Sequence, residues 1–482
     1  MSTPETPASP PSAGAPPTAS DQPNWGAYTR VAIIAAIAGW ALFAIAGFSN
    51  LGAASEEHKH DAKSRFMVGY LSGYIFWFSL PLGGMALLMI RYLAKSSWGL
   101  LLTRPFEAAT RTLPLMLILW VPLAVAVVTH DASPYWWSHD HHEKPEKPEP
   151  SMTSPGDKRD QATAAGKGQI ARAHDRQEDY QKAIKEAHHA EANDIDKARY
   201  GFTSKDGTGF VVVGLVLFAI WGGMIFLLNK WGRETSAATD PAVVDRGLEK
   251  LQNLSGPGLI VFAITITAAA SQWVMSLEPG WSSTMFPVIF AVNQFLTCFA
   301  FCLSLFLLWA SRPPFKGYMR SKFQLDMGTL LLAFTLFWSY TSFSQFMLVW
   351  IGNLPEEIPF YLKRSNYHGA RSGWWYVSAA LIALHFALPF LLLLFRNIKL
   401  HPVKLRIVAT YLVCLCVVDV IWWIAPSAPA HGSFPTWLID VGAVFGVGGV
   451  WGVYFIHQLK KRPLFADNQA FLLPEGHDHG SH

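Results

Sequence analysis

Charged residues are scarce over most of this 482-residue chain. It has 38 Lys and Arg and 34 Asp and Glu, and 27 of these 72 residues fall in the segment 130–209. The other 402 positions hold only 45 charges, whereas about a quarter of a soluble domain is charged. This scarcity excludes an ordinary soluble enzyme. The net charge of +4 is not a nucleic-acid signal either, because it follows the membrane topology described below.

Cysteine is rare as well. The four cysteines, Cys298, Cys302, Cys414 and Cys416, all lie inside apolar runs. No Cys-x-x-Cys-His sequence for covalent haem occurs, and no Cys/His spacing matches a metal site. We therefore read these cysteines as apolar packing residues, and we expect no redox cofactor and no metal in this chain.

The ends of the chain and one internal segment lack long apolar runs. Residues 1–24 are mostly Pro, Ala, Ser and Thr without a basic start, which predicts a disordered cytoplasmic tail and no signal peptide. Residues 130–209 predict a charged outer insert, and 463–482 a His-rich cytoplasmic tail. We read three histidine groups as solvated sequence and not as metal sites; they comprise His139, His141 and His142, His188 and His189, and His477, His479 and His482.

Long apolar runs dominate the rest, in segments 25–129 and 210–462. About 20 mostly apolar residues are needed to cross a bilayer as a helix. The sequence predicts an all-α integral membrane protein with three spans before the insert and seven after it. The ten predicted spans are 31–49, 66–90, 113–129, 210–229, 258–277, 285–311, 326–351, 374–396, 405–424 and 437–459.

The orientation follows from the short loops, because cytoplasmic loops are enriched in Lys and Arg. One side of the predicted topology carries 20 Lys and Arg, and the other carries 6. Both termini are therefore expected in the cytoplasm, and the insert 130–209 outside.

Few ionisable residues lie within the spans, and such residues are functional candidates because burying them in lipid is costly. His385 lies near the middle of the eighth span, and Pro389 leaves the carbonyl of His385 without a helical donor. Asp419 lies in the ninth span. The two differ in depth by roughly 9 Å, so we expect a water between them. A single mid-membrane histidine does not suffice for haem b.

The seventh span has a polar stretch, TLFWSYTSFSQF. Thr335, Ser339 and Ser342 share one helix face, and Tyr340 adds a further hydroxyl. Such groups either hold a file of water that conducts protons or bond neighbouring helices together. In the tenth span, glycines at small-xxx-small spacing predict close helix packing; they are Gly442, Gly446, Gly448 and Gly452.

Three stretches between 278 and 462 resemble one family. They are EPGWSSTMFPVIFAVNQF, RPPFKGYMRSKFQLDMGTLLLAFTLFWSYTSFSQFMLVWIGNLPEEIPFYLKR and WWIAPSAPAHG with the later FPTWLIDVGAVFGVGG. They are similar to ActF membrane subunits of bacterial alternative complex III, a quinol:cytochrome c oxidoreductase, within the wider group of NrfD- and PsrC-like proteins. Over 25–277 the resemblance rests on the span count and the position of the insert.

The resemblance implies two four-helix bundles, spans 2–5 and 6–9, with spans 1 and 10 outside them. It implies a multi-pass subunit of the bacterial inner membrane without cofactors of its own. Its partners would be an ActC-like ten-span sister, subunits with haem c and iron–sulfur clusters, a terminal oxidase, and lipids; nucleic acid is not among them. Quinol would be the substrate of the complex.

For individual residues, the resemblance implies a proton path and leaves the quinol site open. The path would comprise Asp326, Ser339, Tyr340, His385, Asp419 and, near the outside, Glu278. For quinol, no His/Asp pair at one outer membrane depth stands out, and the nearest candidates are His130 and Asp131 at the end of the third span.

The leading hypothesis is therefore a subunit that scaffolds a quinol-oxidising respiratory complex and moves protons, without being catalytic alone. Two alternatives stay open. One is a secondary transporter, although Pro81 and Pro389 do not fall at corresponding positions of a repeat. The other is a purely structural subunit whose polar residues only join helices.

Overall fold

The structure is a computed structural model. It describes residues 23–55, 58–95, 98–138, 207–278, 281–310, 321–352, 357–367, 370–428 and 435–462. The predicted tails, apart from Pro23 and Asn24, lie outside these ranges. So do residues 139–206 of the insert and the three histidine groups.

Helices make up almost all the regular structure of the described chain, and the one sheet is a pair of two-residue antiparallel strands. In chain order, the elements are α1 (Trp25–Ala53), α2 (Lys59–Ala94), α3 (Trp98–Thr110), α4 (Leu113–Thr129), the 3-10 turn η3 (Trp136–Ser138), α6 (Thr208–Ala237), α7 (Pro241–Trp273), the 3-10 turn η4 (Met275–Leu277), α8 (Phe286–Trp309), α9 (Ser321–Gly352), α10 (Ile358–Ser365), β1 (Asn366–Tyr367), β2 (Ala370–Arg371), α11 (Gly373–Ala380), the π-helical segment η5 (Leu381–Ala387), α12 (Leu388–Leu394), α13 (Arg396–Leu400), α14 (Pro402–Ile424), the 3-10 turn η6 (Ala425–Ser427) and α15 (Trp437–Lys460).

The starts of several helices follow from local chemistry. The Asn24 side chain accepts a hydrogen bond from the backbone N–H of Ala27 at 3.1 Å, and it begins α1. Asp240 caps α7 in the same way, with Pro241 at the first helical position. These side chains satisfy backbone donors that the first turn of a helix leaves free.

Within the described ranges, nine helical segments are long and apolar enough to cross a membrane, so the chain is a multi-pass membrane protein. They are Trp25–Ala53, Lys59–Ala94, Leu101–Thr129, Thr208–Ala237, Pro241–Leu277, Phe286–Trp309, Gly373–Leu394, Pro402–Ser427 and Trp437–Lys460. The tenth predicted span, 326–351, lies in α9, which is 32 residues long but falls outside these nine. The hydroxyl and amide side chains of its second half lower its apolar character.

Apolar side chains also cover outer surfaces of the helices. Ile34, Phe48, Ile264 and Trp350 are each more than 60% exposed in the isolated chain. Apolar surface on this scale is unfavourable in water but suits hydrocarbon. Helices also satisfy their backbone groups internally, as a lipid environment demands.

Helix α2 is the axis of the fold. Its apolar stretch is more deeply buried than that of any other of the nine spans, and it packs on α3, α4, α7, α8, α14 and α15. Glycines allow these close approaches. A Cβ on Gly73 would lie 2.7 Å from the Ala443 carbonyl carbon of α15, and one on Gly83 would lie 2.8 Å from Cys298 Cβ of α8.

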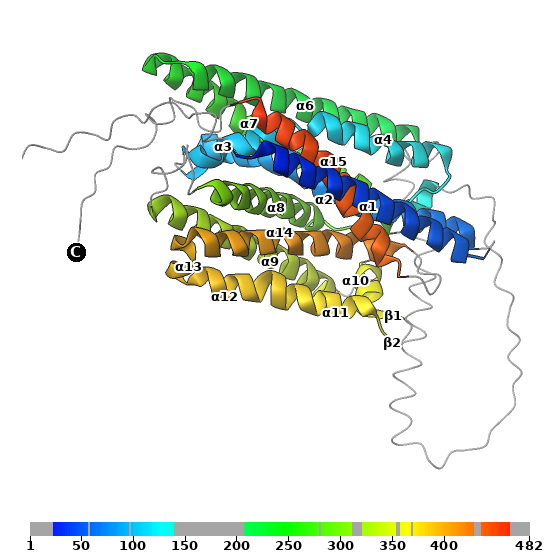
Figure 1. Cartoon of the computed structure of the whole chain (residues 1–482). Helices are drawn as coiled ribbons and strands as arrows, with labels where there is room; N and C mark the ends of the chain where they lie inside the picture. The colour runs from blue at the N-terminus through cyan, green and yellow to red at the C-terminus, as the bar shows by residue number, and fades with distance from the viewer. Residues whose placement is uncertain are drawn as a thin grey trace, which may run out of the picture.

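The other helices pack on either side of α2. Helix α6 packs on α4 and α7, whereas α8 packs on α9 and α14, and α9 packs on α12 and α13. In Figure 1, α4 and α6 lie on one flank of the molecule and α11 and α12 on the other, while α1 runs along α15. The elements α10, β1 and β2 lie at the end opposite α3 and α13.

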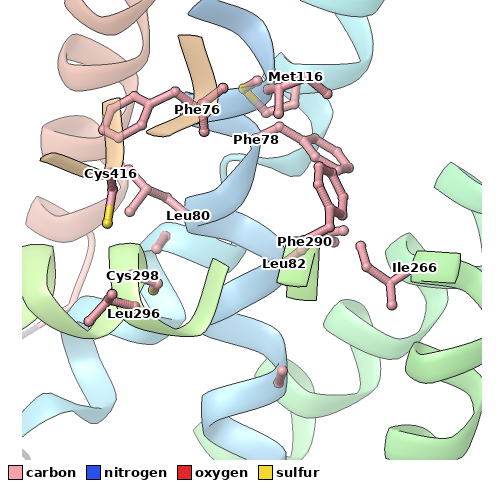
Figure 2. Packing of buried hydrophobic residues seen from close by; sticks show 14 of the residues in the cluster. Phe76, Phe78, Leu80, Leu82, Met116, Ile266, Phe290, Leu296, Cys298 and Cys416 are labelled. Carbon is pink, nitrogen blue, oxygen red and sulfur yellow. The ribbon is translucent and has the colours of Figure 1, made fainter. Parts of the chain in front are cut away.

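The four cysteines are free thiols, and three are buried; Cys414 is exposed. Figure 2 shows Cys298 and Cys416 among apolar side chains, including Phe76, Leu80 and Leu296. The prediction that cysteines pack as apolar residues is confirmed for Cys298, Cys302 and Cys416, which belong to the hydrophobic core.

The third span differs from the predicted range 113–129. It covers Leu101–Thr129 and is interrupted between α3 and α4, where Arg111 and Thr112 lie. Segment 98–110, which lies between the predicted spans 66–90 and 113–129, forms a helix whose Leu102, Phe106 and Ala109 are fully buried. Its one arginine, Arg104, pairs with the buried carboxylate of Glu107, so it does not force the segment into water.

The predicted close packing of the tenth span is confirmed, with α1 as the main partner of α15. We expect Gly449→Ala to destabilise the protein, because its Cβ would overlap the backbone of Ala36. Overpacking of this kind costs about 1–3 kcal/mol, measurable by unfolding in detergent. Gly452→Ala is the matched control, because its Cβ would make an ordinary 3.4 Å contact with Ala32 Cβ. Equal stability of the two variants would contradict this prediction.

Candidate functional site

A buried carboxylate joins three helices in the membrane-spanning region. Asp419 of α14 is 2% exposed. Its Oδ2 atom accepts hydrogen bonds from Trp338 Nε1 of α9 at 2.8 Å and from Asn293 Nδ2 of α8 at 2.9 Å. Thr297, one turn further along α8, donates to Asn293 Oδ1 at 3.2 Å and thereby orients the amide. These contacts hold the carboxylate in a fixed position between the helices.

A fully buried histidine lies against the same tryptophan. The rings of His385 and Trp338 have their centroids 4.0 Å apart, with 31° between their planes. His385 Nε2 lies 3.8 Å from Cys416 Sγ, which is one helical turn before Asp419 on α14. His385 Nδ1 has no hydrogen-bond partner among the described residues. An unsatisfied buried nitrogen is unusual in a native protein and needs a physical explanation.

The backbone around His385 is a π-helix, the segment η5. The N–H of Leu388 bonds to the carbonyl of Ala383, five residues earlier, where an α-helix would bond to the residue four earlier. Pro389 provides no N–H to the carbonyl of His385. The irregularity predicted from Pro389 is therefore a widened turn that includes His385. Such turns occur frequently at functional sites.

The structure therefore brings Asp419 and His385 into one cluster, with the Trp338 indole in contact with both. The depth difference predicted from sequence is bridged by this indole, which bonds Asp419 and stacks on His385. A carboxylate and an imidazole are groups that take up and release protons.

Electrostatics distinguishes Asp419 from other buried carboxylates of the described chain. Asp440 pairs with Arg65, Glu107 pairs with two arginines, and Glu278 pairs with Lys363. The hydrogen-bond donors found for Asp419 are instead a neutral indole and a neutral amide. An ion pair holds a carboxylate in its charged form, whereas neutral donors leave Asp419 able to gain a proton without breaking a salt bridge.

The hydroxyls of α9 do not join this cluster. Thr335 and Thr341 are buried, and each donates to a carbonyl of its own helix. Ser339 is half-buried, and Tyr340 is 66% exposed on the outer surface of α9. Asp326 is half-buried near the start of the same helix.

Glu278 lies apart from Asp419, in a second network at the end of the bundle that carries α10. Its Oε2 accepts from Lys363 Nζ at 2.6 Å, and its Oε1 accepts from Ser427 Oγ at 2.7 Å. Arg364 lies 3.7 Å from Oε1, donates to the carbonyls of Trp422 and Trp423, and stacks on a ring of α10. Burial lowers the pKa of Arg364 to about 10, although Glu278 acts in the opposite direction. This network joins η4, α10 and η6.

His130 and Asp131, the residues nearest to a quinol pair in the sequence, point to different partners. His130 Nδ1 contacts the carbonyl oxygen of Ser138. Asp131 is mostly exposed and forms a 2.8 Å ion pair with Lys63 of α2, and the hydrogen bond from Lys63 lowers the pKa of the Asp131 carboxyl. Both residues thus fasten the chain after α4 to its surroundings.

Sequence reasoning missed two residues, Trp338 and Glu107. Trp338 lies within the polar stretch of α9, but an indole counts as apolar in hydropathy. The neighbouring hydroxyl residues were therefore selected as candidates instead of Trp338. Glu107 lies among arginines of a segment read as loop, yet it is 1% exposed. The four-residue spacing of Asn293 and Thr297 did mark one shared helix face.

Comparison of the sequence with protein-family models and with curated proteins finds no match in either. The described residues also contain no group of three or more His, Cys, Asp or Glu arranged to hold a metal ion.

We expect Trp338→Phe to lower the free energy of unfolding by about 1–2 kcal/mol, because the Asp419 carboxylate loses one of its buried donors. The measurement is unfolding in detergent. Trp350→Phe on the same helix is the control, since Trp350 is 72% exposed and its replacement should change stability by less than about 0.5 kcal/mol. Equal losses in the two variants would show that the indole N–H does not stabilise the cluster.

Proposed function

We propose that this chain is an integral membrane subunit of a quinol:electron acceptor oxidoreductase complex, which it scaffolds and in which it moves protons. The observation that carries the proton role is the Asp419 carboxylate, buried between α8, α9 and α14 with neutral donors and beside His385. The resemblance of 278–462 to ActF subunits of alternative complex III suggests which complex the chain would belong to.

The helix packing supports the expected arrangement. Helix α2 packs with α3, α4 and α7, and α6 with α7; α8 packs with α9 and α14, and α9 with α12. We assign the first set and the second set to two four-helix bundles, with α1 and α15 outside them. We also assign α9 as a tenth span, because it packs on α8, α12 and α13 within the same assembly of helices.

With ten spans the two termini lie on one side. The excess of Lys and Arg in the loops on that side assigns it to the cytoplasm of a bacterial inner membrane. We call this end of the bundle the inner end. It carries α3 and α13, and the outer end carries α10, β1 and β2. The insert 130–209 then lies outside, available to partner subunits.

In the proposed path, Asp419 is the central proton-binding group. Trp338 and Asn293 stabilise its carboxylate by hydrogen bonds, and His385 lies next to the indole as a second site for a proton. Asp326 would receive protons at the inner end of α9, and Glu278, held in its charged form by Lys363, would lie at the outer end of the path as a fixed negative charge. Ser339 and Tyr340 would act only through water or a partner subunit on the outer face of α9.

The chemistry of electron transfer would belong to partner subunits. Haem c and iron–sulfur clusters are expected there, and an ActC-like sister is the better candidate for oxidising quinol. This chain would contribute its membrane helices, its outer insert and the buried acid.

A secondary transporter is the second candidate, and the interrupted third span favours it. Helix α3 ends at Thr110 and α4 begins at Leu113, with Arg111 between them. Transporters form their binding sites from discontinuous helices of this kind. Solute uptake by the purified chain alone in liposomes would support this candidate over the first.

Asp419→Asn tests the proton role. The amide keeps the size of the side chain but cannot exchange a proton, so we expect proton translocation by the purified complex in liposomes to fall by about tenfold or more. Cys414→Ala is the control, because Cys414 is on the exposed face of α14 and its replacement should leave translocation unchanged.

Two outcomes would contradict this role. Unchanged turnover and an unchanged number of protons per electron would exclude Asp419 from the path. Poor assembly, with normal turnover in whatever complex does assemble, would assign the cluster a purely structural role.

Purification through a tag at the C-terminus tests the assignment to a complex. We expect c-type haem absorption, iron–sulfur subunits and a second ten-span subunit to co-purify from native membranes after gentle solubilisation. A colourless chain that purifies alone would contradict membership of a respiratory complex.

A further inference from the structure

Arginines gather at the inner end of the bundle, around the interruption between α3 and α4. We call Arg91, Arg104, Arg111 and Arg462, together with Glu107, the arginine cluster. Its members come from α2, from α3, from the interruption and from the end of α15. None of them takes part in the Asp419 site.

Glu107 is the centre of the cluster. Its Oε2 accepts hydrogen bonds from Arg104 Nη1 and from Arg462 Nη1, each at 2.8 Å. Its Oε1 has no hydrogen-bond partner among the described residues. A Cβ added to Gly232 of α6 would lie 3.1 Å from this Oε1 atom and 3.5 Å from the Tyr92 hydroxyl. Glycine at 232 therefore lets the backbone of α6 lie close to the carboxylate.

Arg111 lies next to this centre, at the break in the span. It donates to the carbonyl of Gln458 of α15 at 3.0 Å and contacts Asn229 Oδ1 of α6 at 3.5 Å. The guanidinium groups of Arg104 and Arg462 are close enough to repel that of Arg111. Arg111 is half-buried, so part of its side chain is accessible from outside the protein.

The charges of the cluster do not balance. Among the described residues the cluster holds four guanidinium groups and one carboxylate, Glu107, which forms ion pairs with Arg104 and Arg462, and a guanidinium does not lose its proton in a protein. Arg91 and Arg104 are each 6% exposed. The Nε atoms of Arg91, Arg104 and Arg111 have no hydrogen-bond partner among the described residues. A buried charge without compensation is strongly unfavourable, so the cluster calls for an anion.

Phosphate fits this set of donors best. Guanidinium groups bind phosphate oxygens through two parallel hydrogen bonds. The cluster lies near the ends of α2, α6 and α15, at the depth where we expect lipid headgroups in the proposed topology. Basic pockets between membrane helices on the cytoplasmic side are known sites for anionic headgroups. Half-buried Arg111 and Arg462 form the entrance, while Arg91 and Arg104 lie deeper.

We propose that the arginine cluster binds a phosphate group at the inner end of the bundle, either that of an anionic lipid or free inorganic phosphate. The bound anion would neutralise the excess charge and join α3, α6 and α15 at the interrupted span. This binding site is independent of the proton role of Asp419.

The test uses the full chain in its purified complex, reconstituted in nanodiscs of phosphatidylcholine with or without phosphatidylglycerol. Thermal unfolding and native mass spectrometry are recorded, and inorganic phosphate is titrated into the phosphatidylcholine discs. We expect phosphatidylglycerol to raise the melting temperature and to remain bound in the mass spectrum. Stabilisation by phosphate alone, without a retained lipid, would identify free phosphate as the ligand.

Arg462→Gln and Lys461→Gln form a matched pair, since each removes one positive charge at the end of α15 and Lys461 is exposed outside the cluster. We expect Arg462→Gln to weaken the binding of whichever probe stabilises the wild type by more than tenfold, and Lys461→Gln by less than twofold. Equal weakening would overturn the proposal in favour of general surface charge. The absence of any stabilisation by either probe would overturn it as well.

Arg462→Lys covers the case in which Arg462→Gln does not fold. It keeps the charge that Glu107 needs but loses the fork that binds two oxygens. We expect phosphate binding to weaken severalfold while stability without ligand stays near that of the wild type. Wild-type affinity in Arg462→Lys would show that the guanidinium does not contact the phosphate.

Discussion

Every ionisable group within the hydrocarbon thickness of a bilayer must find its partners inside the protein, because lipid tails offer none. The helices of this chain are fastened where that demand is met. Arg65 and Asp440 join α2 to α15 near the outer end. Asp419 joins α14 to α8 and α9. Glu107 joins α3 to the end of α15 near the inner end. Apolar packing around α2 supplies most of the contact area, but these polar links fix which helix faces which.

The charge of the hydrogen-bond partner distinguishes buried carboxylates that hold helices together from the one proposed to transfer protons. Carboxylates at the two ends of the bundle pair with arginine or lysine, and such pairs stay ionised and hold helices in place. Asp419 has neutral donors, so its stability in the membrane depends less on its charge. That contrast, between Asp419 on one hand and Glu107 and Asp440 on the other, makes Asp419 the best candidate for a group that changes protonation during function.

The positions of the membrane spans were predicted well from the sequence, because hydropathy determines them. Which side chains face the bundle was predicted less well, because that depends on the rotation of each helix about its axis. Nine of the ten predicted spans correspond to apolar helices, because lipid selects long apolar runs directly. His385 and Asp419 stood out because ionisable residues are rare in such runs. Tyr340 was grouped with them, yet it is exposed, because spacing along one helix does not reveal which face meets the bundle. Glu107 was not recognised as buried, because the arginines near it make the sequence of this helix resemble a cytoplasmic loop.

Irregular backbone occurs at the His385 site and at the arginine cluster, and the reason is the same in each case. The side chains of a regular apolar helix leave little room for polar groups. A buried polar group therefore reaches its partners where the backbone hydrogen bonds of the helix are interrupted. At η5 the widened turn includes His385 and brings its ring onto Trp338. Between α3 and α4 the break places Arg111 against the Gln458 carbonyl of α15. The sequence marks the first break by Pro389 and the second by Pro114, just inside α4. Polar chemistry inside this membrane protein is therefore encoded as much by where the helices are interrupted as by the charged residues themselves.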